Sequence, residues 1–420
     1  MDNFFICGGN KLNGEIDIST SKNATLPILA ACILCDKQIV IHKFPKYEDT
    51  KNMLAILENL GAKWKYQEDS VVIDTDTISK CEIPVELASK IRSSIFSLGS
   101  IISRFKKAKV AYPGGCNIGS RPIDLHLKGL SALGVKIIER HGYIYCNGSN
   151  MKSGIITLDF PSVGATENII LAAVFLKGTT KIINCAREPE IIDLANFLNF
   201  LGAKITGAGT SVIEINGVES LKGGEYTPIG DRIIAGTYAI ATAMCGGRII
   251  LHNTNYENNF ALLDNRKNNS CKIGYKGGKI TLSAERRPKG ISKIETRPFP
   301  GFPTDLQPQI ISMLSVSKGT SVVVENMFES RFKHIGELKK LGADIIIQDN
   351  AAIIKGVNQL YGASVVSCDL RGGAGMVLAG LVADGYTTVC DVRHIDRGYY
   401  HLETDLQKLG ANIERFSTKE

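Results

Sequence analysis

The sequence predicts an α/β fold of two domains, each an inside-out α/β barrel made of three repeats of about 70 residues. Three observations lead to this prediction. The chain has 420 residues, which is long for one hydrophobic core and favours two domains. A Leu-Gly step followed by a strand recurs along the chain. The helical segments 22–34 and 373–383 are apolar on nearly all sides, which is typical of buried helices.

The Leu-Gly step predicts where each repeat ends a helix and begins a strand. Its glycines stand at positions 61, 134, 202, 342 and 410. Apolar residues at helical spacing end at a glycine, which tolerates a positive φ, and an alternating strand follows. The interval between 202 and 342 is twice the others, so a degenerate copy is expected near residue 272. The sequence of that region still predicts the start of a strand, but it no longer contains the Leu-Gly step. We therefore expect six repeats, grouped three and three.

The order of elements inside a repeat follows from the third copy. Residues 155–160 are expected to form a strand, 164–176 a helix and 179–183 a second strand. The same order fits 231–252 and 364–391. Each repeat is therefore mixed α/β, and buried helices wrapped by sheets give the inside-out arrangement.

Composition and charge exclude several classes of function. Hydrophobic residues make up 44% and charged residues 22%, which is ordinary for a globular protein, and the net charge is only +7. The basic stretch 104–109 is too short for a nucleic-acid tract. The first residues have no basic region followed by a long apolar run, so we expect no signal peptide, and no apolar run is long enough to span a membrane. We expect a cytoplasmic protein without nucleic-acid or membrane partners.

The cysteines favour a reducing compartment. There are eleven, an odd number, and they are scattered without regular spacing, which does not fit a disulfide framework. Cys32 and Cys35 are separated by two residues in an apolar run, which favours a helix core position over a redox motif. No second cysteine pair stands at zinc-ligand spacing, so we expect no metal site.

Two stretches of the first half combine glycine or hydroxyl residues with charge. Residues 19–24 open a helix, where free backbone N–H groups and Lys22 favour an anion; a capped helix with a surface lysine is the alternative. Residues 113–124 form a glycine-rich loop that contains Cys116 and Arg121. A thiol beside cations has a lowered pKa and is reactive, which favours a catalytic role for Cys116 over a purely structural one.

The second half offers a carboxylate and three arginines. Asp305 lies between turn residues in 302–307 and could act as a general base or simply cap a helix. Arg331, Arg371 and Arg397 stand at turns of the repeats, and arginine binds carboxylate and phosphate through two parallel hydrogen bonds. They could form one anion pocket, or they could pair locally. The local acids that compete for them are Glu329, Asp369 and Asp396.

At these residues the sequence resembles the UDP-N-acetylglucosamine 1-carboxyvinyltransferases, an enolpyruvyl transferase family. The loop Gly114-Gly115-Cys116, followed by Arg121-Pro122-Ile123-Asp124-Leu125, is highly specific. The matching pieces run in order along almost the whole chain: 21–24, 113–126, 162–168, 186–190, 302–305, 329–332 and 394–399. The resemblance implies two inside-out α/β domains of three repeats and no cofactor. It also implies transfer of the enolpyruvyl group of phosphoenolpyruvate to the 3′-hydroxyl of UDP-N-acetylglucosamine, the first committed step of peptidoglycan precursor synthesis.

The resemblance also assigns roles to individual residues. Cys116 matches the general acid that protonates the methylene carbon and can bond covalently to phosphoenolpyruvate, and Asp305 matches the acceptor of the hydroxyl proton. Cations expected to hold phosphoenolpyruvate are Lys22, Arg121 and Arg397, with Arg331 and Arg371 as supporting cations. Residues expected to contact the nucleotide sugar or other ligand groups are Asn23, Arg92, Arg121, Pro122, Ile123, Asp124, Leu125, Ser162, Val163, Gly164, Asp305, Met327 and Phe328.

The resemblance implies where the domain boundaries lie, and at two places this sequence departs from the pattern of the family. Residues 22–229 are expected to form the nucleotide-sugar domain with the Cys116 loop, and 1–21 plus 230–420 the domain whose cleft wall carries Asp305 and the arginines. Phe160 stands where some members have a lysine near the diphosphate. Residues 256–276 lose the usual helix and turn signal, so we expect a degraded peripheral helix there.

Two alternative functions remain open at this point. The first is that of the shikimate-pathway enolpyruvyl transferase, which shares the fold but lacks the cysteine loop. The second is that of a paralogue that binds the nucleotide sugar without turnover.

Overall fold

The structure, a computed structural model, describes residues 2–114, 118–119, 122–259, 261–263, 271–285 and 287–417. The chain divides into two compact units. The inserted unit consists of Thr20–Cys116 and Pro122–Ile229, and the terminal unit of Met1–Ser19, Asn117–Arg121 and Gly230–Glu420. Cys116 and Arg121, both predicted site residues, lie outside the described residues.

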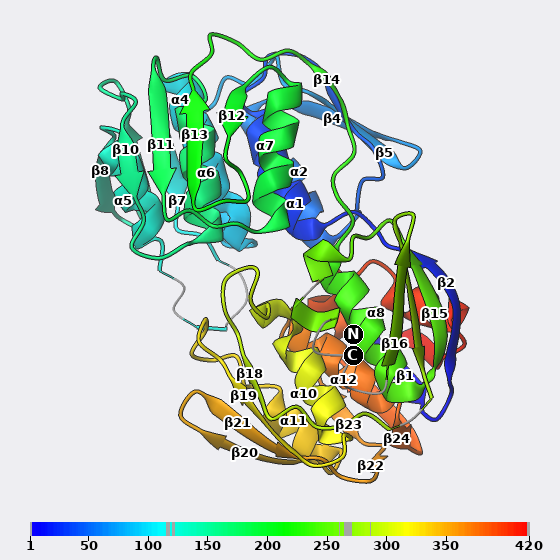
Figure 1. Cartoon of the computed structure of the whole chain (residues 1–420). Coiled ribbons are helices and arrows are strands. Elements are labelled where there is room, and N and C mark those ends of the chain that lie inside the picture. The colour runs from blue at the N-terminus through cyan, green and yellow to red at the C-terminus, as the bar shows by residue number, and fades with distance from the viewer. Residues whose placement is uncertain are drawn as a thin grey trace. The chain divides into compact units, whose positions relative to one another are not determined.

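Three four-stranded sheets form the outside of the inserted unit in its described part (Figure 1). In spatial order their strands are β14 (Gly224–Tyr226), β3 (Ile39–Ile41), β5 (Ser70–Asp74) and β4 (Lys63–Gln67); β6 (Glu82–Ile83), β7 (Lys107–Ala111), β9 (Tyr143–Asn147) and β8 (Lys136–Arg140); and β10 (Ile155–Thr157), β11 (Thr179–Ile183), β13 (Val212–Asn216) and β12 (Lys204–Thr206). The helices are α1 (Lys22–Cys32), α2 (Glu48–Leu60), α3 (Val85–Ala88), η1 (Arg92–Ile95), α4 (Phe96–Phe105), α5 (Asp124–Ala132), α6 (Val163–Ala173) and α7 (Pro189–Phe200).

The terminal unit repeats this plan in its described residues. Its four-stranded sheets are β16 (Cys271–Lys276), β17 (Lys279–Ala284), β15 (Gly247–His252) and β2 (Leu12–Asp17); β18 (Lys293–Glu295), β19 (Thr320–Val324), β21 (Ala351–Lys355) and β20 (Asp344–Gln348); and β23 (Ser364–Val366), β25 (Tyr386–Cys390), β1 (Asp2–Cys7) and β26 (Asn412–Ser417). A short pair joins β22 (Leu360–Tyr361) to β24 (Ala383–Asp384). The helices are α8 (Arg232–Cys245), η2 (Glu257–Asn259), η3 (Thr304–Leu306), α10 (Gln307–Ser315), α11 (Ile335–Lys340), α12 (Leu370–Gly380), η4 (Val392–Arg397) and α13 (Leu402–Lys408).

All six of these sheets share one pairing pattern. One edge pair is parallel, as in β10–β11, and the remaining pairs are antiparallel, as in β11–β13 and β13–β12. A parallel pair of consecutive strands needs a crossover, which a buried helix supplies, as α6 does between β10 and β11, whereas an antiparallel pair needs only a short turn. Three sheets are completed by strands distant in sequence: β1 and β2 come from the N-terminus, and β14 closes the sheet of β3.

The buried helices occupy the inside of each unit. Every residue of α1 from Ala24 to Cys32 is buried, and every residue of α12 is buried. In the inserted unit α4 packs against α6 and α1, and in the terminal unit α10 packs against α12 and α8, with the sheets outside them (Figure 1). Helices buried on all sides explain the apolar runs in the sequence. The predicted α/β fold with inside-out repeats is confirmed.

The Leu-Gly steps are confirmed as helix ends. The five glycines have φ between 89° and 114°. At each step the N–H that follows the glycine bonds back to the carbonyl five residues earlier, as Ala62 does to Leu57 and Ala411 to Leu406. This closes the helix with a left-handed glycine and frees the chain to start a strand.

The element bounds differ from the predicted ones at both ends of the helices. The helix expected at 164–176 is α6, which begins at Val163 because the Ser162 hydroxyl caps it, and which ends at Ala173. The degenerate fourth repeat keeps its sheet, since β16 and β17 are present. Residues 261–263 are helical, whereas 264–270 lie outside the described residues, so the predicted degraded helix stays a prediction. Within the described ranges, every helix is too short or too polar to cross a membrane.

Candidate active site

Asp305 is held between two arginines in the terminal unit. It lies in η3, directly before α10. Oδ1 accepts a hydrogen bond from Nη2 of Arg331 at 3.1 Å, and Oδ2 accepts from Nη2 of Arg371 at 3.0 Å. Both arginine side chains are 2% exposed, whereas Asp305 is 27% exposed. The carboxylate is therefore fixed from behind and keeps a face to which a ligand has access.

The two guanidinium groups retain unused donor capacity. Nε of Arg331 and Nη1 of Arg371 are buried and have no hydrogen-bond partner among the described residues. The Arg371 guanidinium lies 5.4 Å from the centre of the Tyr399 ring. Burial is the largest single effect on the pKa of Arg371 and lowers it, but Asp305, Tyr399 and Asp231 together outweigh burial and raise the pKa further above its usual range. Unused donors on buried cations fit an anionic or polar ligand.

Glu325 holds the turn that carries Asp305 and the segment of Met327 and Phe328 in place, and no pattern in the sequence indicated this role. Its Oε2 accepts from the Thr304 hydroxyl at 2.9 Å, which fixes the start of η3. Its Oε1 accepts from the backbone N–H of Met327 at 2.8 Å and of Phe328 at 3.3 Å. Glu325 is 4% exposed. One buried carboxylate therefore links the predicted sugar-contacting residues to the turn that carries Asp305.

The local acids are not the main partners of Arg331 and Arg371. Asp369 caps α12 by accepting from the N–H groups of Arg371 and Gly372 at 3.0 and 3.1 Å, and lies 3.7 Å from Nη1 of Arg331. His334 is buried beside it, with Nδ1 3.1 Å from the carbonyl of Arg331. Burial lowers the pKa of His334 to about 4 and outweighs the raising effect of Asp369.

Arg397 is the last residue of η4 in the terminal unit. Its neighbour Asp396 was the expected competitor for its charge, but Asp396 pairs with Arg415 of β26 at 2.7 Å. In the terminal unit the carbonyl of Ile118 accepts from the N–H of Ser330 at 3.1 Å.

Lys22 and Asn23 form the first turn of α1 in the inserted unit. The Ser21 hydroxyl caps this helix by accepting from the N–H of Ala24 at 3.3 Å. Lys22 is 12% exposed, and its Nζ lies 3.2 Å from Oδ2 of Asp49, a residue of α2 that the sequence did not single out. A serine-capped helix start carrying a lysine is a favourable place for an anion.

Ser162, Val163 and Gly164 form the start of α6, which is built in the same way. The Ser162 hydroxyl accepts from the N–H of Ala165 at 3.3 Å. A Cβ at Gly164 would lie 2.9 Å from Cε1 of His126, so only glycine fits there without movement. His126, on α5, accepts at Nδ1 from the Asn168 amide at 3.1 Å, which sets the ring's position.

The remaining predicted residues lie at two further helix starts of the inserted unit. Pro122 and Ile123 precede α5, and Asp124 and Leu125 are in its first turn. Arg92 is the first residue of η1. The structure thus places the described site residues of this unit at helix starts, on α1, η1, α5 and α6. Among the described residues no cluster of His, Cys, Asp and Glu could hold a metal ion.

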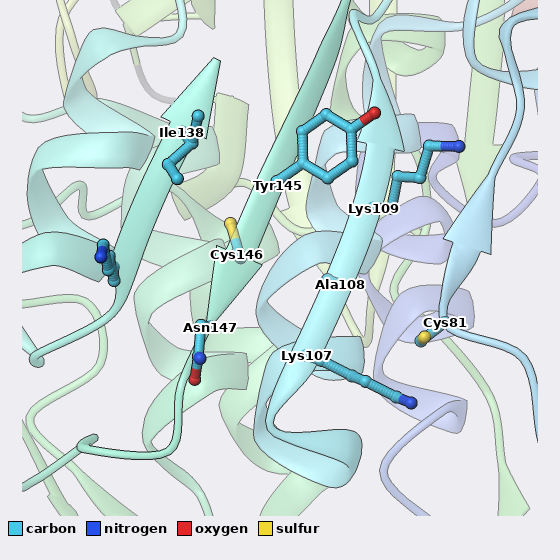
Figure 2. A pocket seen from close by; sticks show the side chains of 9 residues that line it. Cys81, Lys107, Ala108, Lys109, Ile138, Tyr145, Cys146 and Asn147 are labelled. Carbon is cyan, nitrogen blue, oxygen red and sulfur yellow. The ribbon is translucent and has the colours of Figure 1, made fainter. Parts of the chain in front are cut away.

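A shallow hollow on the outer face of the sheet β6–β7–β9–β8 is separate from these residues. It has a volume of about 360 Å³ and is lined by Lys107, Lys109, Lys136, Ile138, Tyr145 and neighbouring residues. Figure 2 shows Lys109 and Tyr145 projecting from adjacent strands. None of the described site residues lines it.

The chain matches known proteins over nearly its whole length. Residues 6–406 match the EPSP synthase (3-phosphoshikimate 1-carboxyvinyltransferase) family. The chain is 49% identical over 415 residues to UDP-N-acetylglucosamine 1-carboxyvinyltransferase 2 of Caldanaerobacter subterraneus subsp. tengcongensis, covering 99% of this chain and 100% of the relative. This chain belongs to the UDP-N-acetylglucosamine 1-carboxyvinyltransferases, within the EPSP synthase family. The expected family is confirmed.

Further matches agree with this family of enzymes. UDP-N-acetylglucosamine 1-carboxyvinyltransferase 1 of Carboxydothermus hydrogenoformans is 45% identical over 420 residues, covering 100% of both chains. The solved structure of the enolpyruvyl transferase NikO from Streptomyces tendae superposes with a TM-score of 0.88 at 23% identity, covering 100% of this chain and 99% of NikO. The solved structure of EPSP synthase from Acinetobacter baumannii superposes with a TM-score of 0.77 at 17% sequence identity. The match covers 99% of this chain and 100% of the EPSP synthase chain. The two solved structures support the fold.

Proposed function

We propose that this 1-carboxyvinyltransferase moves the enolpyruvyl group of phosphoenolpyruvate to the 3′-hydroxyl of UDP-N-acetylglucosamine and releases phosphate. The observation that carries the proposal is the carboxylate of Asp305, 27% exposed and fixed by two arginines that are each 2% exposed. A hydroxyl acceptor needs such an oriented base, and the developing anions need cations close by. The near-full-length relatives carry the same activity in their names.

The first step that we propose is proton addition. The double bond of phosphoenolpyruvate is a poor electrophile until its methylene carbon gains a proton. Cys116 is the proposed donor: its S–H bond breaks as the new C–H bond forms, and positive charge develops on the adjacent carbon. This role rests on the sequence of the loop, because Cys116 lies outside the described residues.

The second step forms the new bond. The 3′-hydroxyl oxygen attacks the cationic carbon while Asp305 accepts the hydroxyl proton, giving a tetrahedral ketal that still carries phosphate and carboxylate. Arg331 and Arg371 hold Asp305 through one oxygen each, so the carboxylate is oriented before the substrate arrives. The thiolate of Cys116 then takes a proton back from the new methyl group, which restores the double bond as the carbon–oxygen bond to phosphate breaks.

Cations and helix starts provide the binding energy in this proposal. Lys22, Arg121 and Arg397 hold the phosphate and carboxylate of phosphoenolpyruvate. The starts of α5 and α6 hold the uridine diphosphate, because free N–H groups and the helix dipole favour phosphate. Asn23, Arg92, Met327 and Phe328 complete the contacts with the ligands. We also propose a cytoplasmic location, since the ten described cysteines are all free thiols.

The experiment is phosphate release from phosphoenolpyruvate with different acceptors. We expect release that depends on UDP-N-acetylglucosamine. Release with shikimate 3-phosphate in its place would assign the chain to the other enolpyruvyl transfer, and no release with either would indicate a binding protein without turnover. As a check on the thiol, fosfomycin should add mass to the tryptic peptide that contains Cys116. Equal labelling of the other cysteines would contradict an activated Cys116.

A further inference from the structure

Asp396 is adjacent to Arg397 in the chain, yet its carboxylate is bound by another arginine. Both its oxygens accept from Arg415 of β26: Nη1 donates to Oδ2 at 3.0 Å and Nη2 donates to Oδ1 at 2.7 Å. Two parallel hydrogen bonds are the strongest pairing that arginine makes with a carboxylate. The acid nearest in sequence to Arg397 is therefore occupied.

The position of Arg415 is fixed by three further groups. Its Nε donates to Oε1 of Glu403 on α13 at 2.8 Å, and Nη1 donates to Oδ2 of Asp2 on β1 at 3.3 Å. The guanidinium carbon lies 4.9 Å from the centre of the Phe4 ring. The hydrogen bonds with Asp396 raise the pKa of Arg415 most, followed by those with Glu403, against the opposing effect of burial. Arg415 thus remains charged and has little freedom to leave Asp396.

We propose that Arg415 is a positioning residue that sequesters Asp396 and thereby keeps the charge of Arg397 directed to the anionic substrate. This inference rests on the proposed role of Arg397 in holding phosphoenolpyruvate. In this inference the effect of Arg415 on Arg397 passes through Asp396. Its four partners come from β1, η4 and α13 of the same unit, so a residue near the end of the chain controls the charge around η4.

Loss of Arg415 should weaken substrate binding more than the chemical step. Without it, Asp396, Glu403 and Asp2 lack their shared cation, and the carboxylate of Asp396 is attracted to the adjacent guanidinium of Arg397. An arginine that is partly neutralised binds phosphate or carboxylate less well, and one more negative charge repels the substrate. Because this binding precedes the reaction, the Michaelis constant should change more than the turnover rate.

The test is a rescue experiment. We expect Arg415→Gln to raise KM for phosphoenolpyruvate about tenfold, the loss of roughly one charge-assisted contact, with kcat within about threefold of wild type. Adding Asp396→Asn should return KM to within about threefold of wild type, because the competing charge is gone. Arg415→Lys, which keeps the charge and loses the two-bond pairing, should fall between.

The matched control is Arg393→Gln. Arg393 is an arginine of the same η4 segment, 72% exposed and paired with Asp391, so its loss removes the same charge without uncovering Asp396. We expect less than about twofold change in KM, as for most surface ion pairs. If Arg415→Gln does not fold, Arg415→Lys with and without Asp396→Asn gives the same comparison.

Two results would overturn the inference. If Asp396→Asn fails to restore KM in a folded double variant whose wild type releases phosphate normally, Arg415 has only a structural role. If Arg397→Gln leaves KM for phosphoenolpyruvate unchanged, the assumed role of Arg397 is wrong and the inference falls with it. Absence of phosphate release by the wild-type protein would instead overturn the proposed function, and this inference with it.

Discussion

The buried helices begin differently in the two units. In the inserted unit α1 and α6 are capped by the hydroxyls of Ser21 and Ser162. In the terminal unit α8 and α12 are capped by the carboxylates of Asp231 and Asp369. A serine satisfies one N–H group and leaves the positive end of the helix dipole available, whereas an aspartate neutralises it. Helices in matching places of the repeats therefore differ in what they can bind.

The second repeat of each unit shows the same contrast. In both, a short 3-10 helix runs directly into the buried helix: η1 precedes α4, and η3 precedes α10. The inserted unit places a cation there, Arg92, and the terminal unit places an anion, Asp305. One repeated framework thus carries a cationic set of helix starts in one unit and a carboxylate with supporting arginines in the other. The former suits phosphate binding and the latter suits proton transfer.

The largest expected effect tests the carboxylate. Asp305→Asn should lower kcat about 1,000-fold, because an amide cannot accept the hydroxyl proton. Phosphate release under saturating substrates measures it. Asp344→Asn, at an exposed position of β20 in the same unit, is the control and should leave kcat within about twofold. A loss below about tenfold for Asp305→Asn would remove the functional contrast between the units.

The next effect concerns the stability of the buried arginine. Arg371→Met should lower the free energy of unfolding of the terminal unit by about 2 kcal/mol, because it deprives Asp305 of one of its two cations. Urea denaturation measures the change. The control is Lys340→Met, which removes an exposed ion pair with Glu337 and should cost under about 0.5 kcal/mol. Equal costs would show that the guanidinium is not held by Asp305 in solution.

A cap exchange tests the difference between the helix starts directly. Ser162→Asp keeps a cap on α6 but adds the negative charge found at α8 and α12. We expect the dissociation constant for UDP-N-acetylglucosamine, measured by calorimetry, to rise about tenfold with little change in thermal stability. Ser162→Ala separates the two effects, since it costs about 1 kcal/mol of stability and adds no charge. Unchanged binding by Ser162→Asp would mean that this helix start does not meet the diphosphate.

The smallest effects are opposite responses of the two units to pH. Burial lowers the pKa of His334 to about 4, so the unfolded terminal unit binds more protons between pH 4 and 6.5 and stability falls as pH falls through this window. Burial raises the pKa of Asp193 to about 6 against its hydrogen bonds with Tyr226 and Ile229. The folded inserted unit then binds more protons between pH 3.8 and 6, and gains stability as pH falls.

Hydrogen exchange at pH 4.5 and 7.5 resolves the two units separately. His334→Gln should flatten the pH response of the terminal unit, and Asp193→Asn that of the inserted unit. Each variant serves as the control for the other, because each changes only one unit. The same sign of response in both units would contradict the assignment of these groups.

Much of the fold follows from local patterns. The Leu-Gly steps were predictable because a left-handed glycine at a helix end is a local requirement, and the five positions have positive φ. The start of α12 at Leu370 was not predictable, because the sequence does not show whether Asp369 caps the helix or takes another role. For the site, the sequence indicated Asp305 and the arginines, but it did not show that Arg331 and Arg371 converge on one carboxylate.

The sequence by itself determined the repeat, the buried helices, the family and the residue types that carry the proposed chemistry. Only the tertiary structure decided which charges meet. Asp396 pairs with Arg415 and not with its neighbour, Glu325 joins Thr304 to Met327, and Lys22 meets Asp49. The physical reason is the separation along the chain of the residues that interact. A turn or a helix cap depends on residues that are close in sequence. A buried ion pair depends on which side chains, distant in sequence, are brought within about 4 Å of each other by packing.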